Sequence, residues 1–191
     1  MHSQRIKHIF SNNNIMDKML NQQQVWNIAG KQIPIVSSAD MHKYNTLEEM
    51  MDGHNAILIL YQDRHGPHMR AGHWCGLSEM DPDNIAFYDS YGKEPDIQLN
   101  HIPMKYRKRT RQVYNHLARM LHDSNYKNIH YNPYQHQKSK KGINTCGRHV
   151  GMFLRLNIDP EDYHKIIKKL TKYLDYKSPD ELVTDLTKQI I

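Results

Sequence analysis

The sequence predicts an α+β domain in which a small mixed β-sheet is flanked by helices. Residues 55–62 form an almost continuous apolar run of strand length, which is typical of a strand buried on both faces. Two further strand-like segments, residues 70–77 and 84–89, enclose the turn sequence Asp81-Pro82-Asp83-Asn84 and predict a hairpin. The last third of the chain instead repeats apolar residues at helical spacing behind capping residues.

The composition fits one globular domain that is not secreted. A chain of 191 residues can bury a hydrophobic core, and we expect a single domain over residues 1–191. The N-terminus lacks the apolar core of a signal peptide, and no apolar run reaches the roughly 18 residues of a membrane span. The two cysteines, Cys75 and Cys146, give no disulfide framework, which favours a reducing compartment.

The segments before the apolar run predict an arm, a short strand and a short helix. Residues 1–32 are polar, and we expect them to form an N-terminal arm with a short helix over residues 15–24. Residues 33–36 predict a short extended segment. Thr46-Leu47-Glu48-Glu49 has the form of a capping box, so a helix should begin there and run to about Asp52.

Helices dominate the chain after the hairpin. A helix is expected over residues 109–122, and a short strand over residues 129–131. Asp159-Pro160 and Ser178-Pro179 each combine a capping residue with a proline at the first helical position, so each predicts the start of a helix. In the helix that follows Pro160, five residues are expected to face inward: Ile166, Ile167, Leu170, Tyr173 and Leu174.

Cys146 begins another predicted helix, which should stop near Asn157. Its apolar residues recur on one helical face at Val150, Phe153 and Leu154. We expect Asn144 or Thr145 to cap its N-terminus. Gly147 and Gly151 lie one turn apart and should let a neighbouring element approach closely.

A cysteine in the first turn of a helix is a candidate nucleophile. The partial positive charge of the helix end and its free backbone N–H groups both favour the thiolate, which is the reactive form. The simpler interpretation of Cys146 is a small apolar residue in a buried helix, which is the commoner fate of a lone cysteine. The rest of the sequence has to distinguish the two.

A cysteine nucleophile needs a base, a group that orients the base, and donors for the oxyanion. A hairpin centred near residue 81 would set His73 directly opposite Asp89, an imidazole beside a carboxylate. A glutamine from the loop before Cys146, together with the Cys146 backbone N–H, could hold the oxyanion.

These pieces follow one another in a chain order that resembles a known family. Gly72-His73-Trp74, then residues 87–92 (FYDSYG), then a glutamine, and then Thr145-Cys146-Gly147 is similar to the adenain family of viral cysteine proteases and to their relatives, the SUMO-specific proteases. The resemblance covers about residues 55–156. It implies the cysteine-protease fold of that type and a peptide-bond hydrolase that acts through a thioester.

The resemblance also implies roles for individual residues and segments. Residues 55–156 would be the catalytic core, followed by C-terminal helices over residues 159–191. Trp74 and Gly147 would lie beside the active site. The catalytic residues would be His73, Asp89, Gln137 and Cys146.

At the glutamine the spacing departs from that of the related proteases. Gln137 lies nine residues before Cys146 and Gln135 lies eleven before it, farther than in the family. A polar loop that contains Gly142 could bulge to absorb the difference. We expect Gln137 to be the oxyanion residue because it lies nearer, with Gln135 as the alternative.

The same part of the chain allows other assignments: a zinc site, a different nucleophile or a different base. A zinc site formed by His65, His68, His73 and Cys75 fits no zinc template well, and we expect no metal. Cys75 would share a face with His73 but would lie in mid-strand without a helix dipole, so it is the weaker nucleophile. His149 lies one turn after Cys146 and has no evident carboxylate partner, so packing or a surface position is expected.

The basic character of the chain is concentrated in one segment. The formal net charge is +6, with pI ≈ 9.2, which suits a protein that works near nucleic acid. Five basic residues fall within residues 105–111: Lys105, Arg107, Lys108, Arg109 and Arg111. They could simply keep a helix soluble, or they could bind phosphates. Adenain-like proteases use viral DNA as an activator, so the resemblance implies DNA as a partner; no other cofactor is expected.

The resemblance therefore implies a thiol protease that processes viral capsid or other virion precursors. We expect it to act as a monomer in the host cytoplasm or virus factory and in the virion. One alternative keeps the chemistry and changes the substrate, giving a deconjugating protease for ubiquitin-like tails. The other alternative is a basic nucleic-acid-binding protein whose cysteine is inert.

Overall fold

The structure, a computed structural model, describes residues 15–62 and 72–191. Five strands form one sheet in the order β1-β2-β3-β4-β5. The two outer pairs are parallel, and the central pairs β2–β3 and β3–β4 are antiparallel. This mixed sheet confirms the predicted α+β class. The strands are β1 (Ile35–Ser37), β2 (Ala56–Tyr61), β3 (His73–Asp81), β4 (Asn84–Asp89) and β5 (Asn128–Tyr131).

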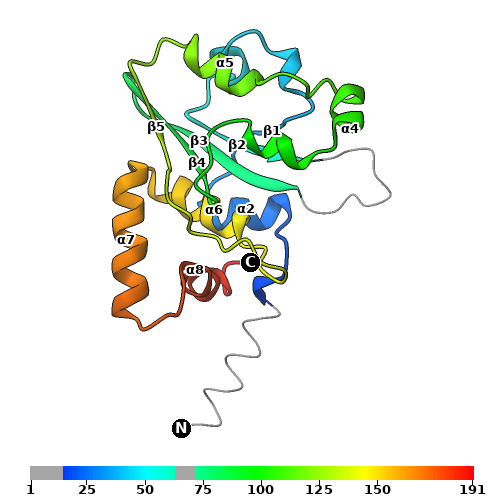
Figure 1. The fold of residues 1–191 in the computed structure, drawn as a ribbon. Helices are drawn as coiled ribbons and strands as arrows, with labels where there is room; N and C mark the ends of the chain where they lie inside the picture. Colours follow the sequence, from blue (N-terminus) through cyan, green and yellow to red (C-terminus); the bar gives the residue numbers. More distant parts are fainter. Residues whose placement is uncertain (1–14, 63–71) are drawn as a thin grey trace.

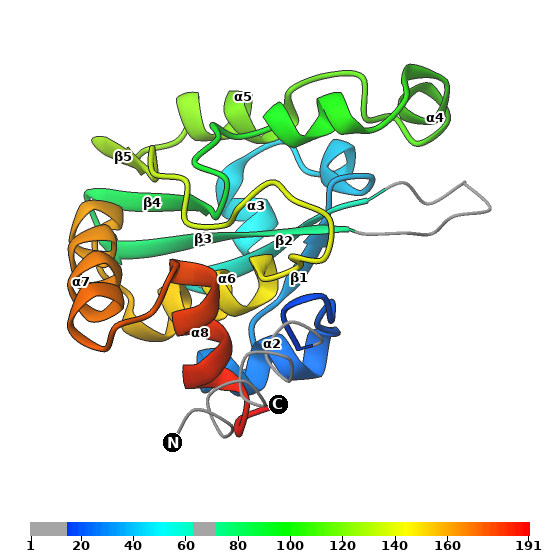
Figure 2. The same ribbon diagram turned by 60° about the horizontal axis from the view of Figure 1, so that its bottom comes forward.

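Helices lie on both sides of the sheet (Figure 1, Figure 2). One side carries α2 (Gln22–Ala29), α6 (Cys146–Leu156), α7 (Pro160–Tyr173) and α8 (Pro179–Thr187). The other side carries α3 (Leu47–Met51), α4 (Met104–Arg109) and α5 (His116–His122), with the short 3₁₀ segments η1 (Met41–Lys43) and η2 (Ile97–His101). None of the helices in the described parts of the chain is both long enough and apolar enough to cross a bilayer.

The strand β2 separates two hydrophobic clusters. Leu58 belongs to the cluster beneath α6, whereas Ile57 and Ile59 belong to the cluster beneath α5. All three side chains are fully buried. The continuous apolar run therefore has the physical cause that was predicted, because each face of the strand meets a different core.

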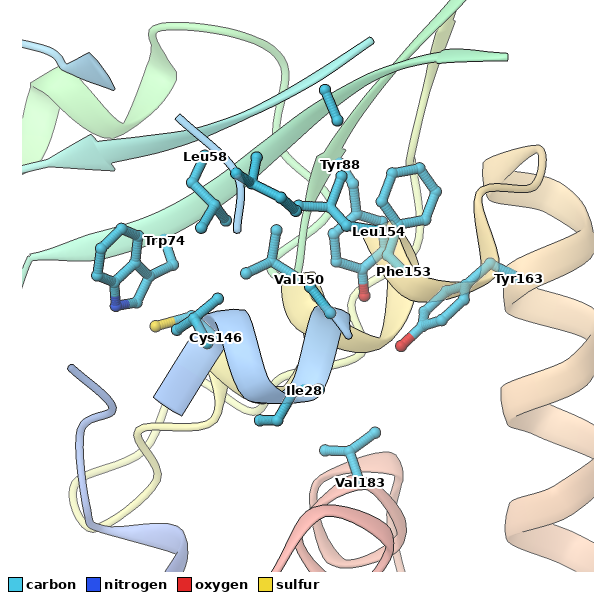
Figure 3. Packing of buried hydrophobic residues seen from close by; sticks show 14 of the residues in the cluster. Ile28, Leu58, Trp74, Tyr88, Cys146, Val150, Phe153, Leu154, Tyr163 and Val183 are labelled. Atoms are coloured by element: carbon cyan, nitrogen blue, oxygen red, sulfur yellow. The ribbon is translucent and has the colours of Figure 1, made fainter. Parts of the chain in front are cut away.

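Helix α6 lies close against β3 and α2 because glycines remove side chains from both contacts. A Cβ atom on Gly76 of β3 would come within 2.6 Å of Val150, and one on Gly151 within 2.8 Å of Ile28 in α2. Figure 3 shows this cluster, with Cys146 beside Trp74 at one end of it. The predicted close approach at Gly151 is confirmed, and it fixes the helix that begins with Cys146.

The prediction of an N-terminal arm is wrong for the described part of residues 1–32. The main helix there is α2 over Gln22–Ala29, not a helix over residues 15–24. Val25 and Ile28 of α2 are fully buried against α6. The segment is polar in composition, but its apolar residues share one face, so it belongs to the core; residues 1–14 lie outside the described residues.

The helix predicted over residues 109–122 is two helices. The chain leaves α4 at Thr110, passes through Arg111 in the left-handed conformation (φ 56°), and begins α5 at His116. Leu117, Met120 and Leu121 of α5 still share the predicted buried face. Local periodicity identified this face correctly but did not show that the Arg107 side chain would bind the backbone of the connecting loop and hold the break.

Helix α7 begins as predicted, but its inward face is narrower than expected. Asp159 caps it and Pro160 occupies its first position. Ile167 is buried, whereas Ile166 and Leu174 are exposed and Tyr173 is 82% exposed. At the end of α7, no element within the described residues covers Tyr173 and Leu174, so this end extends past the core. The last helix, α8, is capped by Ser178 as predicted.

Candidate active site

The hairpin β3–β4 brings His73 and Asp89 together, although not in the predicted register. Asp89 lies directly opposite Cys75, so the pairing is displaced by two residues and His73 is not opposite Asp89 as predicted. A shift by two preserves the face on which each side chain lies. His73 therefore reaches Asp89 diagonally, and its Nε2 lies 2.9 Å from Asp89 Oδ1.

The Asp89 carboxylate is fully buried and held from three directions. Its Oδ1 also accepts a hydrogen bond from the Tyr91 backbone N–H at 2.7 Å. Its Oδ2 accepts one from Gln98 Nε2 at 2.5 Å. The sequence did not predict the role of Gln98, because this residue lies in the short 3₁₀ segment η2 and carries no periodic signal. These donors fix the carboxylate, and the carboxylate in turn can fix the orientation of His73.

Cys146 occupies the first position of α6, as predicted. Burial alone would raise the pKa of its thiol, but interactions with the His73 imidazole and with the backbone N–H groups of Trp74 and Gly147 outweigh burial and lower the pKa. Thr145 occupies the N-cap position, as one of the two predicted capping residues. Its side chain, however, makes no capping hydrogen bond to the helix. The helix end is thereby left with donors that can face the sulfur.

His73 is set up as the partner of this thiol. Burial opposes the charged imidazolium. The electrostatic interaction with Cys75 and the hydrogen bonds with Asp89 and Cys146 outweigh burial, and together they raise the pKa of His73 well above its usual value. A raised histidine pKa and a lowered cysteine pKa favour a thiolate–imidazolium pair. The Tyr91 ring stacks on the imidazole with centroids 4.8 Å apart.

A cleft of about 500 Å³ opens in front of these residues. Its lining includes His73, Cys146 and Tyr91, and it also includes both candidate glutamines, Gln135 and Gln137. The Gln137 side chain is buried and donates to Tyr91 Oη at 3.0 Å and to the Ile143 carbonyl at 3.2 Å. Gln135 is exposed and donates to the Gln137 carbonyl at 3.0 Å. The long loop thus brings both glutamines to the cysteine.

Helix α8 fixes the two ends of that loop. Asp180, fully buried, accepts from the Lys138 backbone N–H at 3.1 Å and from Thr145 Oγ1 at 2.5 Å. His149 Nε2 lies 3.5 Å from Asp180 Oδ1. Within the described residues neither ring nitrogen of His149 makes a hydrogen bond. His149 is fully buried, so of the two expected positions it has the packed one and not the surface one.

Trp74 and Gly147, which the resemblance placed beside the active site, lie next to Cys146 in the structure. The Trp74 side chain is buried, packs in the cluster that contains Cys146, and donates from Nε1 to the Leu20 carbonyl at 3.1 Å. A Cβ atom on Gly147 would come within 3.1 Å of Val25 and 3.2 Å of Trp74. The absence of a side chain at Gly147 therefore lets α2 and Trp74 pack closely around Cys146.

Cys75 lies near the same histidine but in a different environment. Burial, and then the negative charge of Asp89, raise the pKa of Cys75 to about 12. Donor atoms of His73, Cys75 and Asp89 lie within 4.8 Å of one another, so they could also face a metal ion. A cysteine must lose its proton to bind a metal, which the raised pKa opposes. The other zinc ligands considered from the sequence, His65 and His68, lie outside the described residues.

The basic segment, residues 105–111, contains four exposed cations and one buried arginine. Lys105, Lys108, Arg109 and Arg111 are exposed. Arg107 is buried, and its guanidinium donates to the Gln112 and Val113 carbonyls at 2.9 Å and 3.2 Å. Including Arg107 in a phosphate-binding stripe is therefore wrong, because its donors hold the loop after α4. Four cations remain available to a polyanion.

Comparisons with known proteins relate this chain to a viral protein. No protein-family model matches this chain, and no solved structure is significantly similar to it. "Uncharacterized protein V9" of the Sputnik virophage is 34% identical over 155 residues, which span 80% of this chain and 85% of that protein. Similarity of this degree over most of both chains establishes common descent, and the chain belongs to the same family as the Sputnik virophage protein V9.

Proposed function

We propose that this protein is a cysteine endopeptidase of the adenain-like type, and that it hydrolyses peptide bonds through a thioester. The observation that carries the proposal is the 2.9 Å contact between His73 and Asp89 beside a thiol whose pKa is lowered at the start of a helix. His73, Asp89, Gln137 and Cys146 also follow one another in the chain order of that family. The α+β architecture is compatible with it.

The reaction begins with the thiolate of Cys146. Its sulfur attacks the carbonyl carbon of the scissile peptide bond, and the carbonyl oxygen becomes an oxyanion. The His73 imidazolium donates its proton to the leaving nitrogen, the C–N bond breaks, and an amine product leaves a thioester on Cys146. His73 then removes a proton from water, the hydroxide displaces the sulfur, and the thiolate is regenerated with a carboxylic acid product.

Asp89 acts on the histidine rather than on the substrate. Its bond to Nε2 directs the other ring nitrogen, Nδ1, toward the cysteine and stabilises the imidazolium. Gln98 and the Tyr91 backbone N–H hold the carboxylate in place. The oxyanion would be met by the Cys146 backbone N–H and by a side-chain donor from the lining of the cleft.

The substrates we propose are capsid or other virion precursor proteins of a virus. The relationship to a virophage protein supports a viral setting. The site would then work in the host cytoplasm or virus factory and in the virion, as a monomer and without a required metal or organic cofactor. A deconjugating protease for ubiquitin-like tails would use the same four residues on a different protein substrate.

The test is covalent labelling followed by substrate cleavage. A peptide vinyl sulfone should label the wild-type protein at Cys146, and incubation with candidate capsid precursors should generate new N-termini that sequencing can map. The Cys146→Ala variant should neither be labelled nor cleave, and a chelator should leave cleavage unchanged. A protein that is not labelled but binds DNA in a salt-sensitive manner would instead support the nucleic-acid-binding alternative, which the four exposed cations near α4 favour.

A further inference from the structure

Tyr91 is held in the cleft by contacts at both ends of the residue. Its backbone N–H donates to Asp89 Oδ1 at 2.7 Å. Its ring stacks on the His73 imidazole, with planes inclined by 20°. Its side chain lines the cleft together with Cys146 and Gln137. A side chain fixed in this way can present its hydroxyl group at a defined position beside the reacting atoms.

The hydrogen bonds of Gln137 leave its amide without a free donor. A glutamine side chain has two N–H hydrogens and one carbonyl oxygen. Gln137 Nε2 donates to Tyr91 Oη at 3.0 Å and to the Ile143 carbonyl at 3.2 Å. Its Oε1 accepts from Ser90 Oγ at 2.9 Å. In this arrangement Gln137 has no hydrogen to offer an oxyanion.

The Tyr91 phenol has the donor that Gln137 lacks. A phenol can both donate and accept a hydrogen bond. The Tyr91 oxygen accepts one from Gln137 Nε2, so its own hydrogen is still available. Within residues 15–62 and 72–191 nothing accepts the phenol hydrogen. Burial, together with the negative charges of Cys146 and Asp89, raises the pKa of Tyr91 despite the opposing charge of His73. The phenol therefore keeps its proton at neutral pH.

We propose that Tyr91 is a further catalytic residue, whose hydroxyl donates a hydrogen bond to the oxyanion while Gln137 holds that hydroxyl in place. The inference deepens the proposed peptidase function and rests on it. As the Cys146 thiolate adds to the carbonyl, the oxygen gains negative charge and accepts from the Cys146 N–H and the Tyr91 O–H. No proton is transferred, and both bonds are released when the carbonyl re-forms as the thioester.

The decisive variant is Tyr91→Phe, which removes the hydroxyl and keeps the ring that stacks on His73. We expect kcat for peptide hydrolysis to fall by about 10²–10³, the usual loss for one oxyanion donor, with KM little changed. The kcat of Gln137→Ala should fall by a similar factor. The kcat of the double variant should be no lower than that of the slower single variant, because the two residues act as one unit. If Gln137 itself turned to meet the oxyanion, Tyr91→Phe would retain kcat.

Two probes separate the oxyanion from the nucleophile. Alkylation of Cys146 by iodoacetamide needs the thiolate but forms no oxyanion, so its rate should be equal in wild type and Tyr91→Phe. A peptide aldehyde forms a hemithioacetal whose oxygen occupies the oxyanion position, so its affinity should fall with kcat. The matched control is Tyr131→Phe, an exposed phenol outside the cleft, which should change neither quantity.

The outcomes are distinct. An active wild type with an equally active Tyr91→Phe variant overturns the inference alone. Slower alkylation in Tyr91→Phe also overturns it, because the hydroxyl would then be supporting His73 or Cys146 instead. A wild-type protein that neither hydrolyses peptides nor reacts at Cys146 overturns the proposed function, and the inference with it.

Discussion

Cys75 and Cys146 both lie close to His73, yet their surroundings shift the pKa values of the two thiols in opposite directions. Cys75 is in the middle of β3, directly opposite Asp89 and fully buried. Burial and the Asp89 charge raise its pKa to about 12. Cys146 is also buried, but His73 and two backbone N–H groups lower its pKa. The same histidine is therefore close to one thiol whose pKa is raised and one thiol whose pKa is lowered.

The comparison shows that proximity to an imidazole is not sufficient to activate a thiol. Asp89 stabilises a proton on Cys75, whereas it reaches Cys146 only through His73. Two backbone N–H groups act on Cys146: that of Gly147 in the first turn of α6, and that of Trp74 near the start of β3. The distinction follows from secondary structure and can be tested residue by residue.

The largest effect is expected at the nucleophile. Cys146→Ala should abolish hydrolysis, leaving no turnover above background, while the fold persists because one small side chain replaces another. Cys75→Ala should keep kcat and lose about 1–3 kcal/mol of unfolding free energy, because it empties space in a packed core. Peptide cleavage and denaturant unfolding measure the two quantities. Loss of turnover in Cys75→Ala with activity retained in Cys146→Ala would reverse the assignment.

The pH dependence of labelling sharpens the same comparison. A lowered pKa keeps the Cys146 thiolate present at pH values where an ordinary thiol is protonated, and the raised pKa of His73 keeps its imidazolium present above the usual range. Alkylation of Cys146 should thus persist below the pH at which an ordinary thiol stops reacting, and cease only as the thiolate is protonated. Cys75, which is fully buried and whose pKa is raised, should resist alkylation at neutral pH. Mass spectrometry of alkylated peptides across pH distinguishes them, and equal labelling at neutral pH would refute the difference.

The next effect is expected at Asp89. Asp89→Asn should reduce kcat by up to about 10⁴, with substrate binding less affected, because an amide no longer stabilises the imidazolium or its correct tautomer. Gln98→Ala should give a smaller loss, since it removes one of three groups that hold the carboxylate. Steady-state kinetics resolve both. Turnover close to wild type in Asp89→Asn would exclude Asp89 from the catalytic group.

The choice between the two glutamines predicts a further, smaller loss. Gln137→Ala should cost about 10²–10³ in kcat, whereas Gln135→Ala should leave kcat nearly unchanged. The reason is that the Gln137 side chain is buried and held by Tyr91, Ile143 and Ser90, while Gln135 is exposed. Parallel kinetics of the two variants decide the point. A silent Gln137→Ala with an impaired Gln135→Ala would select the other residue.

Local sequence patterns were sufficient for much of the fold. The apolar run that became β2, the segment that became β4 and the capped starts of α7 and α8 each contain their own signal. The hairpin was predicted with a register two residues from the observed one. Because side chains alternate with a period of two, His73 and Asp89 still lie on one face and meet.

The features that escaped prediction depend on contacts between distant segments. Gln98 reaches Asp89 from an irregular segment, and Asp180 reaches the loop before Cys146 from the last helix. Neither has a spacing that a sequence pattern could reveal. The role of α2 was missed for a related reason: Gly151 predicted a close neighbour of α6, but nothing local identified Ile28 as that neighbour.

The smallest effect concerns the exposed cations around α4. We propose that DNA or another polyanion binds Lys105, Lys108, Arg109 and Arg111 and raises protease activity, as the resemblance to adenain-like proteases implies. The bland alternative is that these charges only keep a short helix solvated. If the cations contact phosphates, the logarithm of the affinity should fall linearly with the logarithm of the salt concentration.

Changing Lys108 and Arg109 to Gln should flatten that slope by about two, one for each lost phosphate contact, without altering basal cleavage. Arg107 is left intact because it holds the loop after α4. The matched control changes Lys168 and Lys169 to Gln on α7, which is remote from α4 (Figure 1), and should leave the slope unchanged. Fluorescence anisotropy across salt concentrations, with peptide cleavage in parallel, measures both. An unchanged slope in the α4 variant, or no stimulation by DNA at low salt, would end this proposal. It would leave the assignment of Cys146 untouched, because Cys146 begins α6 on the other side of the sheet from α4 (Figure 2).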